Sequence, residues 1–190
     1  MKKSIVLMLV LLVSSCWKKP VYLLDEKELS WTPGYEQGDT LLFRSDAMID
    51  TMLVEETGVY NSADQLDNPE DERARFANVF SWSVMKHQDR TFMTMFCLTK
   101  RNETISTIEL SLNERYRSAS LAELHLQQKT IDGVAYDDVL VVDASNTDPV
   151  DASDPFNCEY FLWSKSKGLL QYRYLNGDIY TFYKKLPHKE

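Results

Sequence analysis

The chain has 190 residues, of which 44% are hydrophobic and 12% aromatic, and its formal net charge at pH 7 is −8. This apolar and aromatic content is typical of a folded core and excludes a disordered chain. The acidic balance, without any basic stripe along the sequence, argues against nucleic acid as a partner, because phosphate backbones attract positively charged surfaces.

The first sixteen residues have the organisation of an export signal. Two lysines precede an unbroken apolar run over residues 5–13, and two serines stand directly before Cys16. A basic start, a short apolar core and small residues before the cleavage point are typical of a secretory signal, and the core is shorter than the roughly 20 residues of a membrane-spanning helix. The sequence therefore predicts a signal peptide over 1–15, a lipidated tether over 16–30 and a single β-rich domain over 31–190.

Residues 13–16, Val-Ser-Ser-Cys, resemble the bacterial lipobox, in which the cysteine receives diacylglycerol. The resemblance implies lipid attachment at Cys16, and two or three acyl chains hold a protein stably in a bilayer. An ordinary secretion signal with an incidental cysteine is the alternative. Trp17 stands where retained inner-membrane lipoproteins have Asp, and Lys18 and Lys19 stand where surface-displayed Bacteroidetes lipoproteins have acids. We therefore expect a lipid-anchored protein of the cell envelope, at the periplasmic face of the outer membrane.

Short β-branched and aromatic runs between polar turns predict strands along most of the remaining chain. One segment, 78–86, alternates cleanly, which predicts Phe80 and Trp82 on the buried face and Ser81 and Ser83 on the other. The expected strands up to the last third of the chain cover 41–44, 52–60, 78–86, 92–98, 105–112, 121–128 and 139–142.

The end of the chain carries the clearest local pattern. An Asn-Gly pair at 176–177 predicts a two-residue type I′ hairpin turn, which would pair Tyr174 with Ile179 and place Arg173 beside an exposed Tyr180. Asp-Gly at residues 132–133 predicts a second such turn. The last expected strands cover 160–163, 169–175 and 178–183.

Helical signal is sparse and is confined to a capped, acidic stretch at 68–76. Successive strands with short returns predict an all-β fold. We expect a mainly antiparallel meander, curled into a half-barrel, a barrel or a sandwich so that its edges and apolar face are hidden.

Two cysteines lie in the body of the chain. Cys97 ends one expected strand and Cys158 begins another. In an oxidising compartment such a pair suggests a disulfide, whereas two buried free thiols acting as small apolar side chains are the alternative.

Catalytic and metal-binding patterns do not stand out. The sequence has no G-x-S-x-G, H-E-x-x-H, phosphate-binding Gly-rich loop or C-x-x-C. His87, His125 and His188 are expected in solvent, in a turn, on an outer strand face and in the tail. The acidic stretch 143–154 is rich in oxygen ligands but lacks the glycine and final glutamate of an EF-hand loop, so a solvated connection is favoured over a calcium site. We expect no catalytic residue, no metal and no cofactor.

Aromatic side chains are the other candidate for function. Phe80, Trp82, Tyr172 and Tyr174 are placed on inward strand faces by the alternation. They could line a ligand cavity, since apolar pockets with a few polar groups are the usual small-molecule sites. The alternative is that they fill the core of a small barrel or sandwich.

Residues 132–139, Asp-Gly-Val-Ala-Tyr-Asp-Asp-Val, and residues 161–169, Phe-Leu-Trp-Ser-Lys-Ser-Lys-Gly-Leu, resemble the last third of small uncharacterised Bacteroidetes lipoproteins. The resemblance carries no activity. With a lipid anchor and no catalytic constellation, we expect a non-enzymatic envelope protein whose β-scaffold binds a protein partner or a small apolar ligand. The alternative is an envelope hydrolase acting on glycan or cell-wall material through an Asp/Glu pair, although neighbours such as Asp137 and Asp138 point to opposite faces of a strand.

Overall fold

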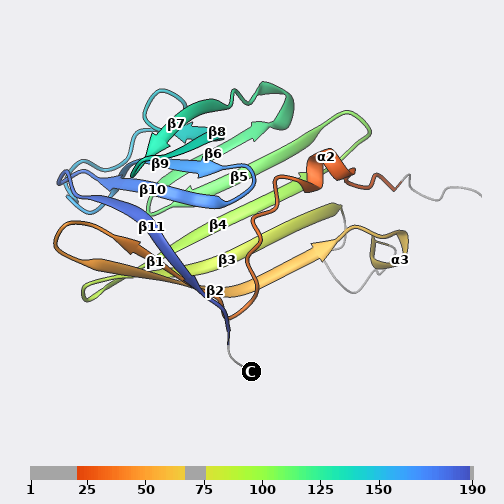
Figure 1. Cartoon of the computed structure of the whole chain (residues 1–190). Helices are drawn as coiled ribbons and strands as arrows, with labels where there is room; N and C mark the ends of the chain where they lie inside the picture. Colours follow the sequence, from red (N-terminus) through yellow and green to blue (C-terminus); the bar gives the residue numbers. More distant parts are fainter. Residues whose placement is uncertain (1–20, 67–75, 189–190) are drawn as a thin grey trace, which may run out of the picture.

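The computed structural model describes residues 21–66 and 76–188 of the chain. Their strands form one eleven-stranded antiparallel sheet in the order β6-β5-β4-β3-β2-β1-β11-β10-β9-β8-β7. The sheet curls into a half-barrel (Figure 1), which confirms the expected all-β fold with little helix. The expected short helix at 68–76 and the proposed lipid site at Cys16 lie outside the described residues, apart from Phe76.

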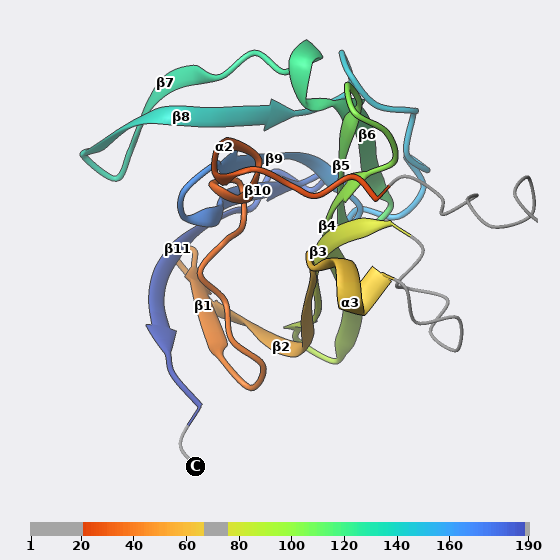
Figure 2. The ribbon, with the colours of Figure 1, turned by 90° about the vertical axis from the view of Figure 1, so that its right-hand side faces the viewer.

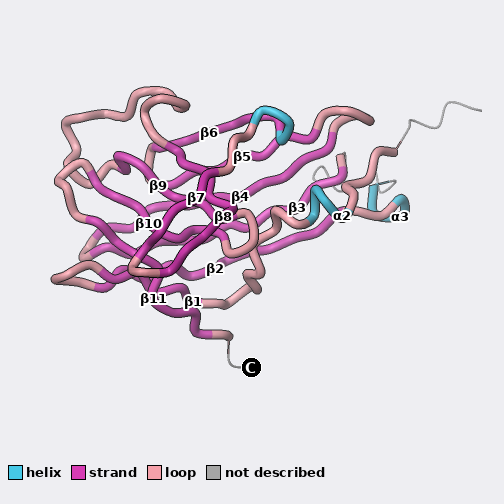
Figure 3. Tube along the Cα trace, turned by 45° about the horizontal axis from the view of Figure 1, so that its top comes forward, coloured by secondary structure: helices cyan, strands magenta, loops and turns pink. Residues whose placement is uncertain are grey.

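Eleven strands make up almost all of the regular structure. They are β1 (Thr40–Arg44), β2 (Ile49–Tyr60), β3 (Ala77–His87), β4 (Arg90–Lys100), β5 (Ser106–Leu112), β6 (Arg115–Ser120), β7 (Gln127–Ile131), β8 (Val134–Val142), β9 (Cys158–Ser164), β10 (Gly168–Tyr174) and β11 (Ile179–Leu186). Within the described ranges the helical pieces are α2 (Glu26–Leu29), α3 (Ala63–Leu66) and the 3-10 turn η2 (Leu121–Glu123), drawn in cyan in Figure 3. No helix in this part of the chain is both long and apolar enough to cross a membrane.

The β5–β6 turn and the first residue of β6 contact the start of β9 at one end of the half-barrel. The carbonyl oxygen of Asn113 accepts a hydrogen bond from the backbone N–H of Cys158 at 3.3 Å. Arg115, fully buried, donates from Nε to the Cys158 carbonyl at 3.2 Å. These contacts bring β6 against the start of β9, so that β7 and β8 lie outside the curve, across the top of the view in Figure 2.

Large apolar side chains fill the interior, and burial of each stabilises the fold by about 1.5–3 kcal/mol. A smaller cluster on the outer side of β9 and β10 is covered by β7 and β8, and it contains Ile131, Val139, Leu162 and Leu170. The main cluster includes Phe43, Met52, Met85, Phe96, Leu98, Ile108, Leu110, Phe161, Trp163, Tyr172, Tyr174 and Tyr180.

The two faces of β3 are opposite to the expectation. Ser81 and Ser83 are buried on the inner face, whereas Trp82 is 39% exposed on the outer face. Phe80 also lies on the outer face, where its ring covers Gly58 so closely that a Cβ there would come within 2.4 Å of the ring. The alternation was predicted correctly, but the buried face was wrong, because small inner side chains leave room for another segment of the chain.

One hairpin is confirmed and the other is corrected. Asp132 and Gly133 both have positive φ between β7 and β8, as a two-residue turn requires. At the last hairpin the Tyr174 N–H instead donates to the Asp178 carbonyl at 3.0 Å, which leaves a three-residue loop. The pairing therefore differs by one residue, so Tyr180 is buried rather than exposed.

Two further segments differ from the sequence expectation. The expected strand over 121–128 is divided between η2 and the beginning of β7, and β6 over Arg115–Ser120 was missed because its inner side chains are arginines and alanine. The expected tether over 16–30 is part of the domain from Leu24 onward, since Leu24 is 4% exposed in the main core.

Candidate functional site

Residues 21–39, called the strap below, cross the open side of the half-barrel. Figure 1 shows them in orange, running from the end that carries α2 toward β1. Trp31 is buried in the main core, and the Leu24 backbone exchanges hydrogen bonds with the Asn61 side chain at 2.7 and 3.0 Å. The strap thus closes a curved sheet that would otherwise expose its concave face.

A capping box and an ion pair fasten the first half of the strap. Asp25 and Glu28 each accept a hydrogen bond from the other's backbone N–H, at 2.7 and 2.8 Å, which is a capping box for α2. The Glu28 carboxylate also accepts from the Lys100 ammonium at 2.9 Å and from the Ser106 hydroxyl. These contacts join α2 to the adjoining ends of β4 and β5.

Tyr35 fastens the second half of the strap to the β9–β10 turn. Its hydroxyl accepts a hydrogen bond from the Leu169 N–H at 2.8 Å and donates to the Lys167 carbonyl at 3.4 Å. Gly168 lies between these two residues with φ at +79°, and a Cβ there would stand 2.0 Å from the Tyr35 hydroxyl oxygen. The Lys-Gly-Leu sequence therefore forms a socket for Tyr35.

Lys185 of β11 holds the end of the strap. Its ammonium donates to the Gly34 carbonyl and to Asp39 Oδ2, both at 3.0 Å. Asp39 also accepts from the Glu36 N–H at 2.8 Å. Burial alone would raise the pKa of Asp39, but these hydrogen bonds and the Lys185 charge hold it below the ordinary value. The pKa of Glu28 is lowered in the same way, by Ser106 and Lys100 against burial.

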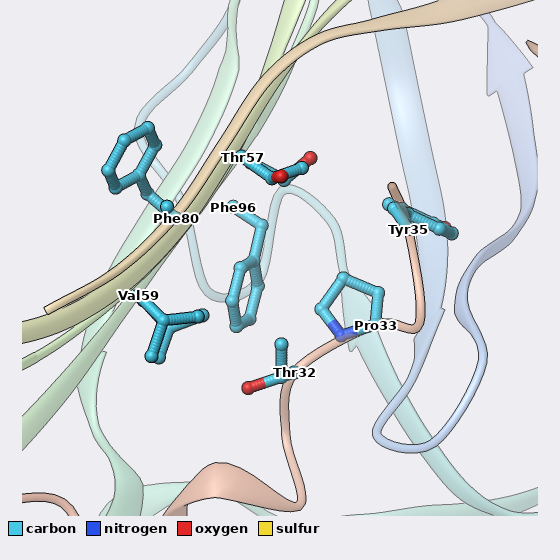
Figure 4. Close-up of a pocket in the computed structure, with 10 residues that line it drawn as sticks. Thr32, Pro33, Tyr35, Thr57, Val59, Phe80 and Phe96 are labelled. Carbon is cyan, nitrogen blue, oxygen red and sulfur yellow. The ribbon is translucent and has the colours of Figure 1, made fainter. Parts of the chain in front are cut away.

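A cavity of about 80 Å³ lies between the strap and the inner face of β2, β3 and β4. Figure 4 shows Thr32, Pro33 and Tyr35 of the strap on one side and Thr57, Val59 and Phe96 on the other, with Phe80 pointing away across the strand. Val79 and Ser81 complete the wall. Most of this lining is apolar.

Three polar groups in and beside the cavity have no hydrogen-bond partner among the described residues. They are the hydroxyls of Thr32 and Ser81 and the indole N–H of Trp163. Trp163 stacks on Phe96 with 5.5 Å between ring centroids. Buried polar groups are normally hydrogen-bonded, so unpartnered ones beside a cavity indicate a place where water or a ligand supplies the partner.

A separate polar cluster lies inside the core and was not predicted. Asp50 Oδ1 is 2.8 Å from Nδ1 of His87, and Asp50 Oδ2 accepts hydrogen bonds from the hydroxyls of Tyr172 and Tyr174. Asp50 and His87 are both fully buried, so the expectation that His87 is solvated in a turn was wrong. The inward alternation of β3, continued from Ser81 to residue 87, is the pattern that places His87 inside.

Burial sets the titration of this cluster. It raises the pKa of Asp50 despite hydrogen bonds from Tyr172, His87 and Tyr174. It also raises the pKa of Tyr172 and Tyr174, as it does for Tyr180 and for Tyr35 of the strap. Because none of the cluster is exposed, it holds β2, β3 and β10 together rather than meeting a substrate.

The four aromatic residues predicted to line one cavity are not brought together. Tyr172 and Tyr174 are fully buried in the core, whereas Phe80 and Trp82 lie on the outer face of β3. The two tyrosines therefore fill the core and do not line a cavity. Phe80 contributes to the cavity wall only from behind, where Gly58 lacks a side chain.

Cys97 and Cys158 are both free thiols in the structure. The Cys97 thiol lies next to the Thr99 hydroxyl at 3.4 Å, and the Cys158 thiol donates to the Tyr160 carbonyl at 3.2 Å. Burial raises the pKa of both thiols. Arg173 pairs with Glu159 at 3.1 Å and not with Tyr180.

The acidic residues form local turns. Asp138 accepts from the Ser164 hydroxyl and the Ser166 N–H, both at 2.8 Å, so its carboxylate is occupied by the β9–β10 turn. In the loop 143–154, the side chains of Asp143 and Asp151 cap residues two positions later. No group of three or more His, Cys, Asp or Glu side chains in the described part of the chain could hold a metal ion.

A second, shallower hollow of about 420 Å³ lies at the free edge of β6, beside the loop 145–148. Its larger polar side chains are already engaged. Arg117 reaches the Val141 carbonyl at 3.4 Å, and Asn146 donates to the same carbonyl at 3.0 Å. The cavity under the strap is therefore the better candidate site, because the Thr32 and Ser81 hydroxyls in its lining have no hydrogen-bond partner among the described residues.

Comparison of the chain with protein-family models, with curated proteins and with solved structures gave no match.

Proposed function

We propose that this chain is a non-enzymatic, lipid-anchored envelope protein that binds a small, mainly apolar molecule between its half-barrel and the strap. The observation that supports this function is the strap-covered cavity with unpartnered hydroxyls on Thr32 and Ser81. Small-molecule sites usually combine apolar walls with a few polar groups that fix orientation. The lipid anchor itself is predicted from the lipobox-like sequence ending at Cys16.

The chemistry of the lining defines the ligand. Val79, Val59 and Phe96 offer apolar contact, while the two hydroxyls can each donate one hydrogen bond and also accept hydrogen bonds. The site carries no charged side chain in its lining. A neutral molecule with an apolar body and one hydroxyl, carbonyl or amide group therefore fits best.

The size of the cavity divides ligands into two groups. At about 80 Å³ it holds only a few non-hydrogen atoms as it stands. A longer apolar molecule would have to displace Pro33 and Tyr35, which cover the same concave face. That movement would break the hydrogen bonds that Tyr35 and Lys185 make at this part of the strap, while Leu24 and Trp31 stay in the core.

Thermal unfolding in the presence of small probes tests the proposal. Acetone and 2-propanol match the cavity as it stands, and phenol and 1-hexanol are probes of the larger group. A ligand at one hundred times its Kd stabilises the folded state by about 2.7 kcal/mol, which raises Tm by about 5–10 °C for a domain of this size. Ser81→Leu fills the cavity, whereas Ser111→Leu makes the same change on a half-buried, outward position of β5.

We expect at least one probe to raise the Tm of the wild type and of Ser111→Leu, and none to raise that of Ser81→Leu. Isothermal titration then gives the stoichiometry, which should be one. If no probe binds, or if Ser81→Leu binds as well as the wild type, the cavity is not the site.

A further inference from the structure

Five exposed apolar side chains gather at the end of the half-barrel where the strap begins. Val21 and Leu23 belong to the strap, Val59 is the next-to-last residue of β2, Phe76 precedes β3, and Ile105 precedes β5. Each is between 42% and 55% exposed. We call these five residues the rim. Single exposed apolar side chains are ordinary on a protein surface, but a group at one end marks an interaction surface.

Contacts between neighbouring residues hold the segments that carry the rim together at this end of the molecule. Leu24, next to Leu23, exchanges hydrogen bonds with Asn61, two residues beyond Val59. The Arg101 guanidinium lies 5.8 Å from the centre of the Phe76 ring. The Arg101 N–H in turn donates to the Ile105 carbonyl at 3.4 Å. Figure 1 shows this end on the right, with α2, α3 and the β4–β5 turn together.

The length of the preceding chain restricts where the rim can lie. Five peptide links separate Cys16 from Val21. At about 3.4 Å each they span at most about 17 Å, so a lipid on Cys16 would keep Val21 within that distance of the bilayer surface. Lys18 and Lys19 fall within this short stretch and carry the charge that anionic headgroups attract.

The opposite end of the molecule exposes Met48, Ile49 and Ile179 and carries a group of aspartates. The β1–β2, β3–β4 and β10–β11 turns gather there with the loop 143–154, at the left of Figure 1. Several aspartates lie in these turns and in the loop: Asp46, Asp89, Asp148, Asp151, Asp154 and Asp178. The charges nearest the rim are also of both signs, since Lys27 and Arg101 accompany Asp25, Glu26 and Glu103. The rim therefore differs from the far end in its position at the start of the strap, not in its charge.

From the exposure of the rim, its place at the start of the strap and the short chain between it and Cys16, we infer that the rim rests on the lipid bilayer, so that the cavity beneath the strap opens at the membrane surface. Val59 connects the two features, because it is 55% exposed on the rim and also lines the cavity. The ligand class that follows is a membrane-dissolved, mainly apolar molecule entering from the lipid phase. This inference rests on the proposed function, which it deepens by naming the source of the ligand.

Fluorescent labels at single positions test the orientation. The full chain, purified from membranes and reconstituted in vesicles of phosphatidylethanolamine and phosphatidylglycerol, carries an NBD label at Phe76→Cys or Ile105→Cys. Cys97→Ser is present in each variant, and Cys158 is fully buried. Matched controls carry the label at Asp89→Cys or Asp178→Cys, in exposed turns of the far end. Mass spectrometry confirms one label per chain.

Rim labels should shift their emission to the blue and lose roughly half or more of their intensity to spin-labelled lipid, as groups at the headgroup boundary do. Control labels should do neither. Any of three results would overturn the inference: equal quenching of rim and control labels, unquenched rim labels, or a chain that does not remain on the vesicles. If the rim labels are quenched but the protein binds no probe, the rim lies on the bilayer and the proposed ligand site is wrong.

Discussion

Replacing Gly168 by alanine should release the strap from the half-barrel. The added Cβ would lie 2.0 Å from the Tyr35 hydroxyl oxygen and 2.5 Å from Tyr35 Cζ, so the ring has to leave its socket. The Leu169 N–H then loses its acceptor, which costs about 1–3 kcal/mol where water cannot replace it. The positive φ of residue 168 adds about 1–2 kcal/mol for alanine. The sum is a destabilisation of about 2–5 kcal/mol.

Gly133→Ala is the matched control for this experiment. Gly133 has nearly the same φ, +80°, but nothing lies within 4 Å of a Cβ placed there, so only the backbone cost of about 1–2 kcal/mol remains. Urea unfolding gives the two free energies, and hydrogen exchange should show lost protection over residues 31–36 in Gly168→Ala alone. In a Tyr35→Ala background the Gly168→Ala cost should fall to that of the control. Equal costs for the two glycine variants in the wild-type background would refute the socket.

Three further outcomes follow from the buried and strap-fastening groups. Asp50→Ala leaves His87 Nδ1 and two tyrosine hydroxyls without an acceptor and should cost about 3–5 kcal/mol in urea unfolding, whereas Asp89→Ala in an exposed turn should change stability by less than about 0.5 kcal/mol. Burial raises the pKa of the core and strap tyrosines, so these side chains stay neutral in the folded protein, whereas tyrosines of the unfolded chain ionise near pH 10. The free energy of unfolding should therefore fall as pH rises above about 10, and tyrosinate absorbance should appear only when the protein unfolds. The pKa values of Glu28 and Asp39 are lowered in the folded protein, so the stability that their carboxylates add is present above about pH 4 and is lost as pH falls through the lowered values. Hydrogen exchange should therefore show the strap losing protection before the sheet in acid. Retained protection of the strap at pH 2 would contradict the conclusion that these two carboxylates fasten it.

The fold was predictable from the sequence because strands and turns leave local signals. Alternation over residues 78–86 and the Asp-Gly turn at 132–133 each depend on a few neighbouring residues, and the structure confirms both. The all-β antiparallel class followed from their repetition along the chain.

The face that each strand buries was harder to predict. On β3 the serines face inward because the strap, distant in sequence, covers that part of the interior. At the last hairpin a three-residue loop replaces the expected two-residue turn, and a slip of one residue turns Tyr180 from the surface into the core. Both outcomes depend on contacts between segments that no local pattern records.

The candidate site was not predictable for the same reason. Residues 24–30 were expected to form a tether, since a short polar stretch behind a lipobox-like cysteine has no strand pattern. Their role depends on partners far along the chain, Lys100 and Ser106 for Glu28, just as that of Tyr35 depends on the socket at Gly168. From the sequence alone, the Lys-Gly-Leu stretch at 167–169 indicates only a resemblance to other chains.

Native mass spectrometry of the full chain, purified gently from the cells that express it, tests the ligand site most directly. We predict a wild-type population carrying one small non-covalent apolar molecule, and an otherwise folded Ser81→Leu population without it. Wild-type protein that carries no such molecule, or a Ser81→Leu protein that retains the same adduct, would contradict a ligand site beneath the strap.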